Sequence, residues 1–140
     1  MRSSPTASGE RGRPPAIVAI LAEDIGYDAP RKRMFRAEAT RLLKQLAGAL
    51  GLGKADYDLR CNEGGVAVSG EATLHADALY VQVSQWSCGA VLYRRCDGRR
   101  DYRGQMNHWA SACELADPVG LADRIAHELR LPTHARDRLL

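Results

Sequence analysis

The sequence predicts an α+β domain: a four-stranded antiparallel meander sheet with helices packed on one face, in the order α-α-β-β-β-β-α. Three observations support this. Between residues 56 and 96 the apolar residues alternate, as in half-buried strands, and no helical pattern intervenes. Segments before and after this region repeat apolar residues every three or four positions. The 140 residues are enough for one domain with a real core, and sequential strands usually neighbour each other.

The first segment, residues 1–15, is rich in Ser, Pro, Gly and Arg, and we expect it to be a disordered tail. The single folded domain is predicted to span residues 16–132. Its first element, residues 16–25, is a short apolar stretch that fits a helix, with a strand as the alternative at this length. Gly26 ends it.

A long helix is predicted to follow. Asp28 is suited to cap its N-terminus, and Pro30 lies in the first turn, where a missing N–H costs nothing. An apolar stripe recurs at helical spacing and consists of Phe35, Ala39, Leu42, Leu43, Leu46 and Leu50. The basic residues lie mostly off this stripe, and we interpret them as a solvated face rather than a phosphate-binding surface: Arg31, Lys32, Arg33, Arg36, Arg41 and Lys44.

Four strands are predicted next. The first covers residues 56–61 and the second residues 66–74, where Gly70 indicates a bulge or a close approach by another element. Residues 78–96 form a hairpin, whose short connection contains Gly89. A final helix begins at Asp117-Pro118 and ends at Pro132, and residues 133–140 should be a frayed tail.

Each predicted helix has one apolar stripe, so all of them should cover the same face of the sheet. That face would carry Leu59, Val66, Val68, Leu74, Leu79, Val81 and Val83. The opposite face would carry Ser69, Glu71, Thr73, Tyr80, Gln82, Ser84 and Trp86. Two aromatic residues on a polar sheet face suggest that the Arg-rich loop, a second subunit or a ligand covers them.

The segment after the hairpin is dense in Arg, aromatic and amide side chains, which donate hydrogen bonds or stack rather than fill a core. We therefore predict a binding surface made of Tyr80, Trp86, Arg94, Arg95, Arg99, Arg100, Tyr102, Asn107, His108 and Trp109. Its expected partner is an anionic ligand or a nucleic acid, or a second copy of the chain in a homodimer. The alternative is that the Arg and Asp side chains pair with each other and hold the loop, while Trp109 anchors in the core.

Composition bears on whether the protein binds nucleic acid, a membrane or a cofactor. The net charge of +3 permits nucleic-acid contact without arguing for it, because dedicated binders have a stronger basic excess. No apolar run approaches the length of a membrane span, so we expect a cytoplasmic protein without a membrane partner. No motif indicates a cofactor.

The four cysteines form no CxxC pair, which favours reduced, partly buried thiols. Two alternatives stay open. Cys88, Cys96, His108 and Cys113 supply the ligand types of a zinc site, although their spacing matches no standard one. A cysteine beside His108 would supply a nucleophile and a base, but buried inert cysteine is the commoner case, so an enzyme is disfavoured.

The segments GGVAVSGEATLHADALYVQVSQ and LYRRCDGRRDYRGQMNHW, with FRAEATRLLKQLAGALGL and YDLR before them, resemble small uncharacterised bacterial proteins encoded by integron and other mobile gene cassettes. The resemblance covers about residues 26–131. It implies a compact bacterial accessory protein and carries no catalytic residues. Together these observations predict a small binding or adaptor module, with a structural homo-oligomer or a Cys/His enzyme as alternatives.

Overall fold

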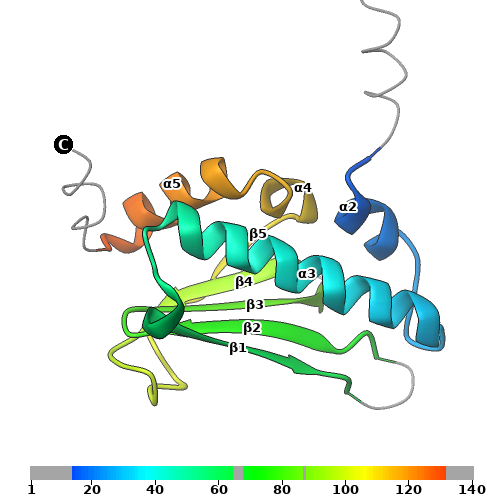
Figure 1. Cartoon of the computed structure of the whole chain (residues 1–140), viewed down its shortest axis with the longest axis horizontal. Coiled ribbons are helices and arrows are strands. Elements are labelled where there is room, and N and C mark those ends of the chain that lie inside the picture. Colours follow the sequence, from blue (N-terminus) through cyan, green and yellow to red (C-terminus); the bar gives the residue numbers. More distant parts are fainter. Residues whose placement is uncertain (1–13, 65–67, 87, 132–140) are drawn as a thin grey trace, which may run out of the picture.

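The structure is a computed structural model that describes residues 14–64, 68–86 and 88–131, apart from the side chain of Trp86. It has two layers, a helical layer and one antiparallel sheet (Figure 1). The helices are α2 (Ala16–Leu21), α3 (Ala29–Ala49), α4 (Ala112–Leu115) and α5 (Pro118–Leu129), with a 3₁₀ turn η1 (Lys54–Asp56). The strands are β1 (Tyr57–Asn62), β2 (Glu71–Ala76), β3 (Leu79–Trp86), β4 (Gly89–Arg95) and β5 (His108–Ala110).

The sheet is a meander with the spatial order β1-β2-β3-β4-β5. This confirms the predicted α+β class, the antiparallel pairing and the helices on one face. The strand count was wrong, because the short segment predicted to be loop pairs with β4 as a fifth strand, with His108 opposite Tyr93 and Ala110 opposite Val91. The chain also forms one more short helix, α4, between that strand and α5.

The two long helices begin where their caps predict. The Asp28 carboxylate accepts a hydrogen bond from the backbone N–H of Arg31, and the Asp117 carboxylate accepts one from Gly120. Helix α3 lies across the sheet with α5 and α2 beside it (Figure 1). Its core-facing residues are Phe35, Ala39, Leu42, Leu43, Leu46 and Ala47.

The core lies between the helices and one sheet face. Leu74, Val81, Val83, Val91 and Tyr93 contribute from the strands and are fully buried. Short apolar α2 also packs here, through Ile17 and Ile20. Helix α2 ends at Leu21, and Ile25 is buried beyond its end, so the predicted element of residues 16–25 is a shorter helix followed by a turn.

The second strand begins later than predicted, at Glu71 rather than residue 66, and it extends to Ala76. Val68 was expected in the core but precedes the strand and is 48% exposed. The reason is Gly70, whose φ of +83° departs from strand geometry, so regular pairing with β1 begins only at Glu71. An added Cβ at Gly70 would lie 2.6 Å from the Asn62 carbonyl oxygen, which is the close approach by another element that this glycine predicted. Val66 lies outside the described residues. The same holds for both predicted tails, residues 1–15 and 133–140, except for residues 14 and 15.

Among the described residues, no helix is both long and apolar enough to cross a membrane.

Candidate functional site

The sheet face opposite the helices, called the far face below, carries the candidate site. Strand register places most of its side chains in two full rows, and Asn62 and Glu71 lie opposite each other beyond the second row. The first row is Asp58, His75, Tyr80 and Arg94, and the second is Arg60, Thr73, Gln82, Leu92 and Trp109. No described helix lies on this side of the sheet (Figure 1).

The first row forms a stack of rings. The guanidinium carbon of Arg94 lies 4.5 Å from the centre of the Tyr80 ring, a cation–π distance. The His75 ring contacts Tyr80 and Tyr102 edge-on, with 5.4 Å between ring centres in both pairs. Strand β3 therefore presents Tyr80 between a cation and an imidazole, and the loop adds a second tyrosine, which is 64% exposed.

Burial and the nearby Glu71 carboxylate raise the pKa of Tyr80, while Arg94 opposes this shift. The Tyr80 hydroxyl stays protonated at neutral pH and donates a 2.7 Å hydrogen bond to the Gln82 side chain. This bond links the two rows and holds the amide of Gln82 in one orientation.

Residues 97–107 form the loop that closes one end of the far face, at the left of the sheet in Figure 1. The Asp101 carboxylate accepts hydrogen bonds from the backbone N–H groups of Asp97, Arg103 and Gly104. These bonds hold the pKa of Asp101 below its usual range. The loop is thus organised around one ionised side chain.

Two arginines fasten this loop to the sheet. Arg94 donates to the carbonyl of Tyr102 at 2.6 Å and to the side chain of Asn107 at 3.2 Å. Arg99 reaches across to the other edge of the sheet, where it donates to the Ala55 carbonyl at 2.6 Å and pairs with Asp58 at 3.3 Å. It also lies 3.3 Å from the Asp77 carboxylate.

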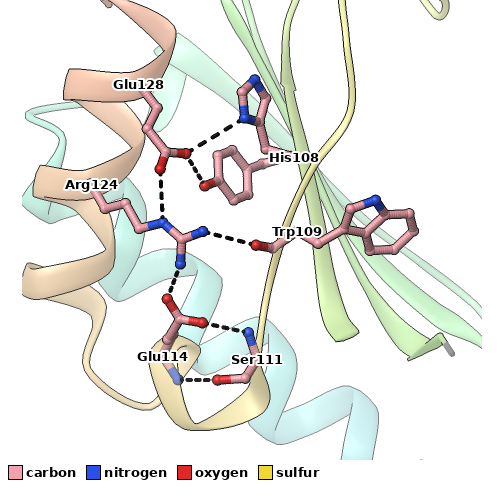
Figure 2. A network of polar contacts seen from close by, with 7 residues as sticks. His108, Trp109, Ser111, Glu114, Arg124 and Glu128 are labelled. Atoms are coloured by element: carbon pink, nitrogen blue, oxygen red, sulfur yellow. Dashed lines mark hydrogen bonds and ion pairs between the residues drawn. The ribbon is translucent and has the colours of Figure 1, made fainter. Parts of the chain in front are cut away.

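The second row is more apolar. Leu92 faces away from the helices yet is only 6% exposed, and its neighbour in register is Trp109. Trp109 points away from the helices in Figure 2 and is half-buried. Thr73 and Gln82 continue the row toward the exposed Arg60.

A separate polar network lies on the helix side of β4 and β5 (Figure 2). Tyr93 donates a short hydrogen bond to Glu128, and His108 stacks on the Tyr93 ring with its Nδ1 3.6 Å from the same carboxylate. Arg124 bridges Glu128 to Glu114, and it also donates to the backbone carbonyl of Trp109 at 3.0 Å.

These contacts set the charges of the network. The hydrogen bond from Tyr93 lowers the pKa of Glu128, and the bond from the Ser111 backbone lowers the pKa of Glu114. Burial raises the pKa of Tyr93, and its bond to Glu128 adds to the shift. The network therefore joins α4, α5 and β5 through ionised carboxylates around a single arginine.

The structure divides the ten predicted site residues. Tyr80, Arg94, Tyr102 and Asn107 come together, and Trp109 lies on the same face. His108 faces Glu128 on the helix side, and Arg95 donates to the carbonyls of Leu129 and Arg130 at the end of α5.

The remaining predicted residues have other places. Arg99 serves as a tether and Arg100 is exposed. The side chain of Trp86 is outside the description. The register shift between Val83 and Trp86 breaks the alternation on which its assignment to the far face depended.

His75 was missed, although it lies in the centre of the stack and is only 8% exposed. Its Nε2 donates to the Gly98 carbonyl at 3.2 Å, which joins β2 to the loop. Its position could have been inferred by extending the alternation of Thr73 by two residues, had the strand not been ended at Leu74.

The positions of the cysteines bear on the zinc and nucleophile alternatives. No group of three metal-binding side chains occurs in the described part of the chain. Cys96 is buried, and burial raises the pKa of its thiol to about 11, which makes it a poor nucleophile at neutral pH. Cys61, Cys88 and Cys113 are exposed and not in disulfides.

Comparisons with protein families, with curated proteins and with solved structures found no match to this chain.

Proposed function

We propose that the protein is a small binding module whose far face docks an acidic surface or segment of another protein. The observation that carries this proposal is the distribution of the layers: every described helix covers one face of the sheet, and the other face presents the Tyr80–Arg94 stack beside Trp109. The integron-cassette resemblance is compatible with an accessory protein of this kind and adds no chemistry.

Composition supports a protein partner. Tyr, Trp and Arg are the residues most enriched where binding energy concentrates in protein interfaces. The far face has these types together with the buried Leu92, and polar Thr73 and Gln82 lie between them. Such a mixture of an apolar centre and a polar rim is typical of non-obligate interfaces.

Charge supports an acidic partner. Arg60 and Arg94 lie in the two rows, and Arg100 and Arg103 are exposed on the adjoining loop. The Asp58 and Asp77 carboxylates are paired with Arg99. Asp101 accepts backbone hydrogen bonds. Glu71, on the same face, and the exposed Asp97 add negative charge. The attraction to an acidic partner therefore depends on the exposed Arg60, Arg100 and Arg103. A nucleic acid is the weaker candidate, because the whole chain has a net charge of only +3.

An enzyme is disfavoured. His108 is held by Glu128 and Tyr93, and the buried Cys96 thiol donates to the backbone carbonyl of Ala76. These contacts support structural roles for both side chains.

The test is an NMR titration of the ¹⁵N-labelled chain with a polyglutamate peptide, which imitates an acidic segment. We expect amide shifts at Arg60, Thr73 and Gln82 that weaken as salt is added. Arg60→Glu should abolish them. The control is Lys44→Glu, which changes the net charge equally but lies on the exposed side of α3.

Equal loss in both variants, or shifts confined to the helices, would contradict the proposal. Light scattering on the same samples tests the homodimer alternative. If the chain is a dimer without peptide and its far-face amides are protected from hydrogen exchange, this face is a homodimer interface instead.

A further inference from the structure

A second surface of the chain, away from the far face, has the features of an oxyanion site. An open hollow of about 460 Å³ lies between the start of α3 and the turn that follows β1. It is lined by Gly26, Tyr27, Ala29, Lys32, Arg33, Arg36, Glu63 and Gly64. We propose that this hollow binds the phosphate group of a small free molecule, which departs from the sequence-based interpretation of Lys32, Arg33 and Arg36 as part of a solvated face.

The charge of the lining is the first argument. Three of its side chains are cationic, Lys32, Arg33 and Arg36, and one is a carboxylate, Glu63. Arg36 follows Arg33 by three positions and Lys32 by four, so its side chain neighbours both of the others on the helix surface. The Lys32 ammonium also donates to the Gly26 carbonyl at 3.3 Å. The excess of positive charge in a concave surface favours an anion.

The state of Arg36 is the second argument. Its side chain is only 15% exposed, whereas its ion-pair partner Glu63, at 3.2 Å, is 81% exposed. Glu63 takes one terminal nitrogen, and the other terminal nitrogen, Nη1, is buried with no hydrogen-bond partner. A buried guanidinium donor without an acceptor is costly. An oxyanion in the hollow would compete with the exposed Glu63 for Arg36, and a rotation of the guanidinium toward the hollow would then give Nη1 an acceptor.

The hollow does not depend on the free N–H groups of the helix start. Asp28 caps α3 by accepting from the backbone of Arg31, so the attraction comes from the side chains. Tyr27, which is 76% exposed, stands at the rim and offers a flat ring to whatever the phosphate is attached to.

The test titrates the ¹⁵N-labelled full chain with inorganic phosphate at constant ionic strength. We expect saturable shifts of the Gly26 and Gly64 amides. Arg36→Gln should weaken binding by roughly tenfold or more, the loss expected when a charged hydrogen-bond donor is removed. Because Arg36 is mostly buried, its substitution could also disturb the fold. The second variant is therefore Arg33→Gln, at an exposed position, which should weaken phosphate binding while the NMR spectrum remains that of a folded protein.

The matched control is Lys44→Gln, which removes one charge from the same helix outside the hollow and should leave phosphate affinity unchanged. Absence of saturable shifts in the wild-type chain, or equal affinity in all variants, would overturn the proposal. A second arm separates two sources of the same oxyanion: co-sedimentation with phosphatidylglycerol vesicles that requires Arg33 would replace the free molecule by a lipid headgroup. Failure of phosphate binding would leave the polyglutamate result on the far face untouched, because the two sets of residues do not overlap.

Discussion

At the scale of single residues, the side chains that matter most are those that hold two elements at once. Arg94 stacks on Tyr80 within the sheet and donates to Tyr102 and Asn107 in the loop. Arg124 does the same for α4, α5 and β5. Such arginines use several of their five N–H donors in a fixed geometry, which a lysine cannot reproduce.

Tyr93→Phe tests the network on the helix side. The hydroxyl donates to the Glu128 carboxylate from a fully buried ring, so its removal should lower the free energy of unfolding by about 1 kcal/mol. This value lies below the usual range for a bond to a charged group because the Glu128 side chain is one-third exposed and solvent screens its charge. Urea unfolding gives the measurement. Tyr27→Phe, at an exposed ring, should change stability negligibly, and an equally stable Tyr93→Phe would show that the bond to Glu128 is not formed in solution.

Neighbouring residues also explain what the sequence could predict about the site. Arg94 and Arg95 are adjacent in a strand, so their side chains must face opposite sides, and a single surface containing both was excluded by alternation alone. The same holds for His108 and Trp109 once β5 is recognised. A three-residue strand is too short for its alternation to be recognised in the sequence. The sequence therefore could not predict which side of the sheet His108 and Trp109 face.

At the scale of elements, the loop of residues 97–107 depends on backbone geometry as much as on charge. Gly104 has a φ of +64°, and a Cβ added there would lie 2.7 Å from the Arg95 carbonyl oxygen. The left-handed conformation and the contact both require glycine. At Gly104 the loop thus lies closer to β4 than a residue with a side chain would allow.

Gly104→Ala should destabilise the protein by about 1–3 kcal/mol, because alanine meets both the strain and the carbonyl. The matched substitution is Gly48→Ala in the last turn of α3, where an added Cβ has nothing within 4 Å. It should stabilise the protein by about 0.5–1 kcal/mol through helix propensity. Thermal and urea unfolding of both variants give the comparison; two effects of the same sign would contradict the described loop conformation.

The elements that sequence predicted well are those with local signals. Asp28 and Asp117 cap their helices as expected, and the hairpin of β3 and β4 follows the alternation of Leu79, Val81 and Val83. Strand β2 was misplaced because its start depends on the backbone conformation at Gly70, which lies close to the carbonyls of Asn62 and Glu63. The glycine itself indicated a close approach, but periodicity carries no information on where the strand starts relative to it.

At the scale of the whole molecule, the free energy of unfolding should depend on pH in the acidic range. Four carboxyl groups have pKa values held below their ordinary range by hydrogen bonds, namely Glu38, Asp101, Glu114 and Glu128. A carboxyl whose folded pKa is depressed contributes stability above its unfolded pKa, and this contribution is lost as the pH falls through the folded value.

The free energy of unfolding should therefore stay constant near neutral pH. It should decrease once the pH drops below the ordinary pKa values of Glu and Asp, 4.5 and 3.8. Urea unfolding at a series of pH values measures this. The double variant Glu114→Gln with Glu128→Gln should be less stable at neutral pH and lose less on acidification. A wild-type curve that stays flat to well below these values would count against the network as described.

The placement of the first and last described helices has a practical consequence. Helix α2 and helix α5, the first and last elements that are described, both belong to the helical layer (Figure 1). A tether to a sensor chip or a reporter joined beside α2 or α5 would thus leave the bare sheet turned toward the bulk solution, on the side away from the helices. Orientation on a support needs no re-engineering of the fold.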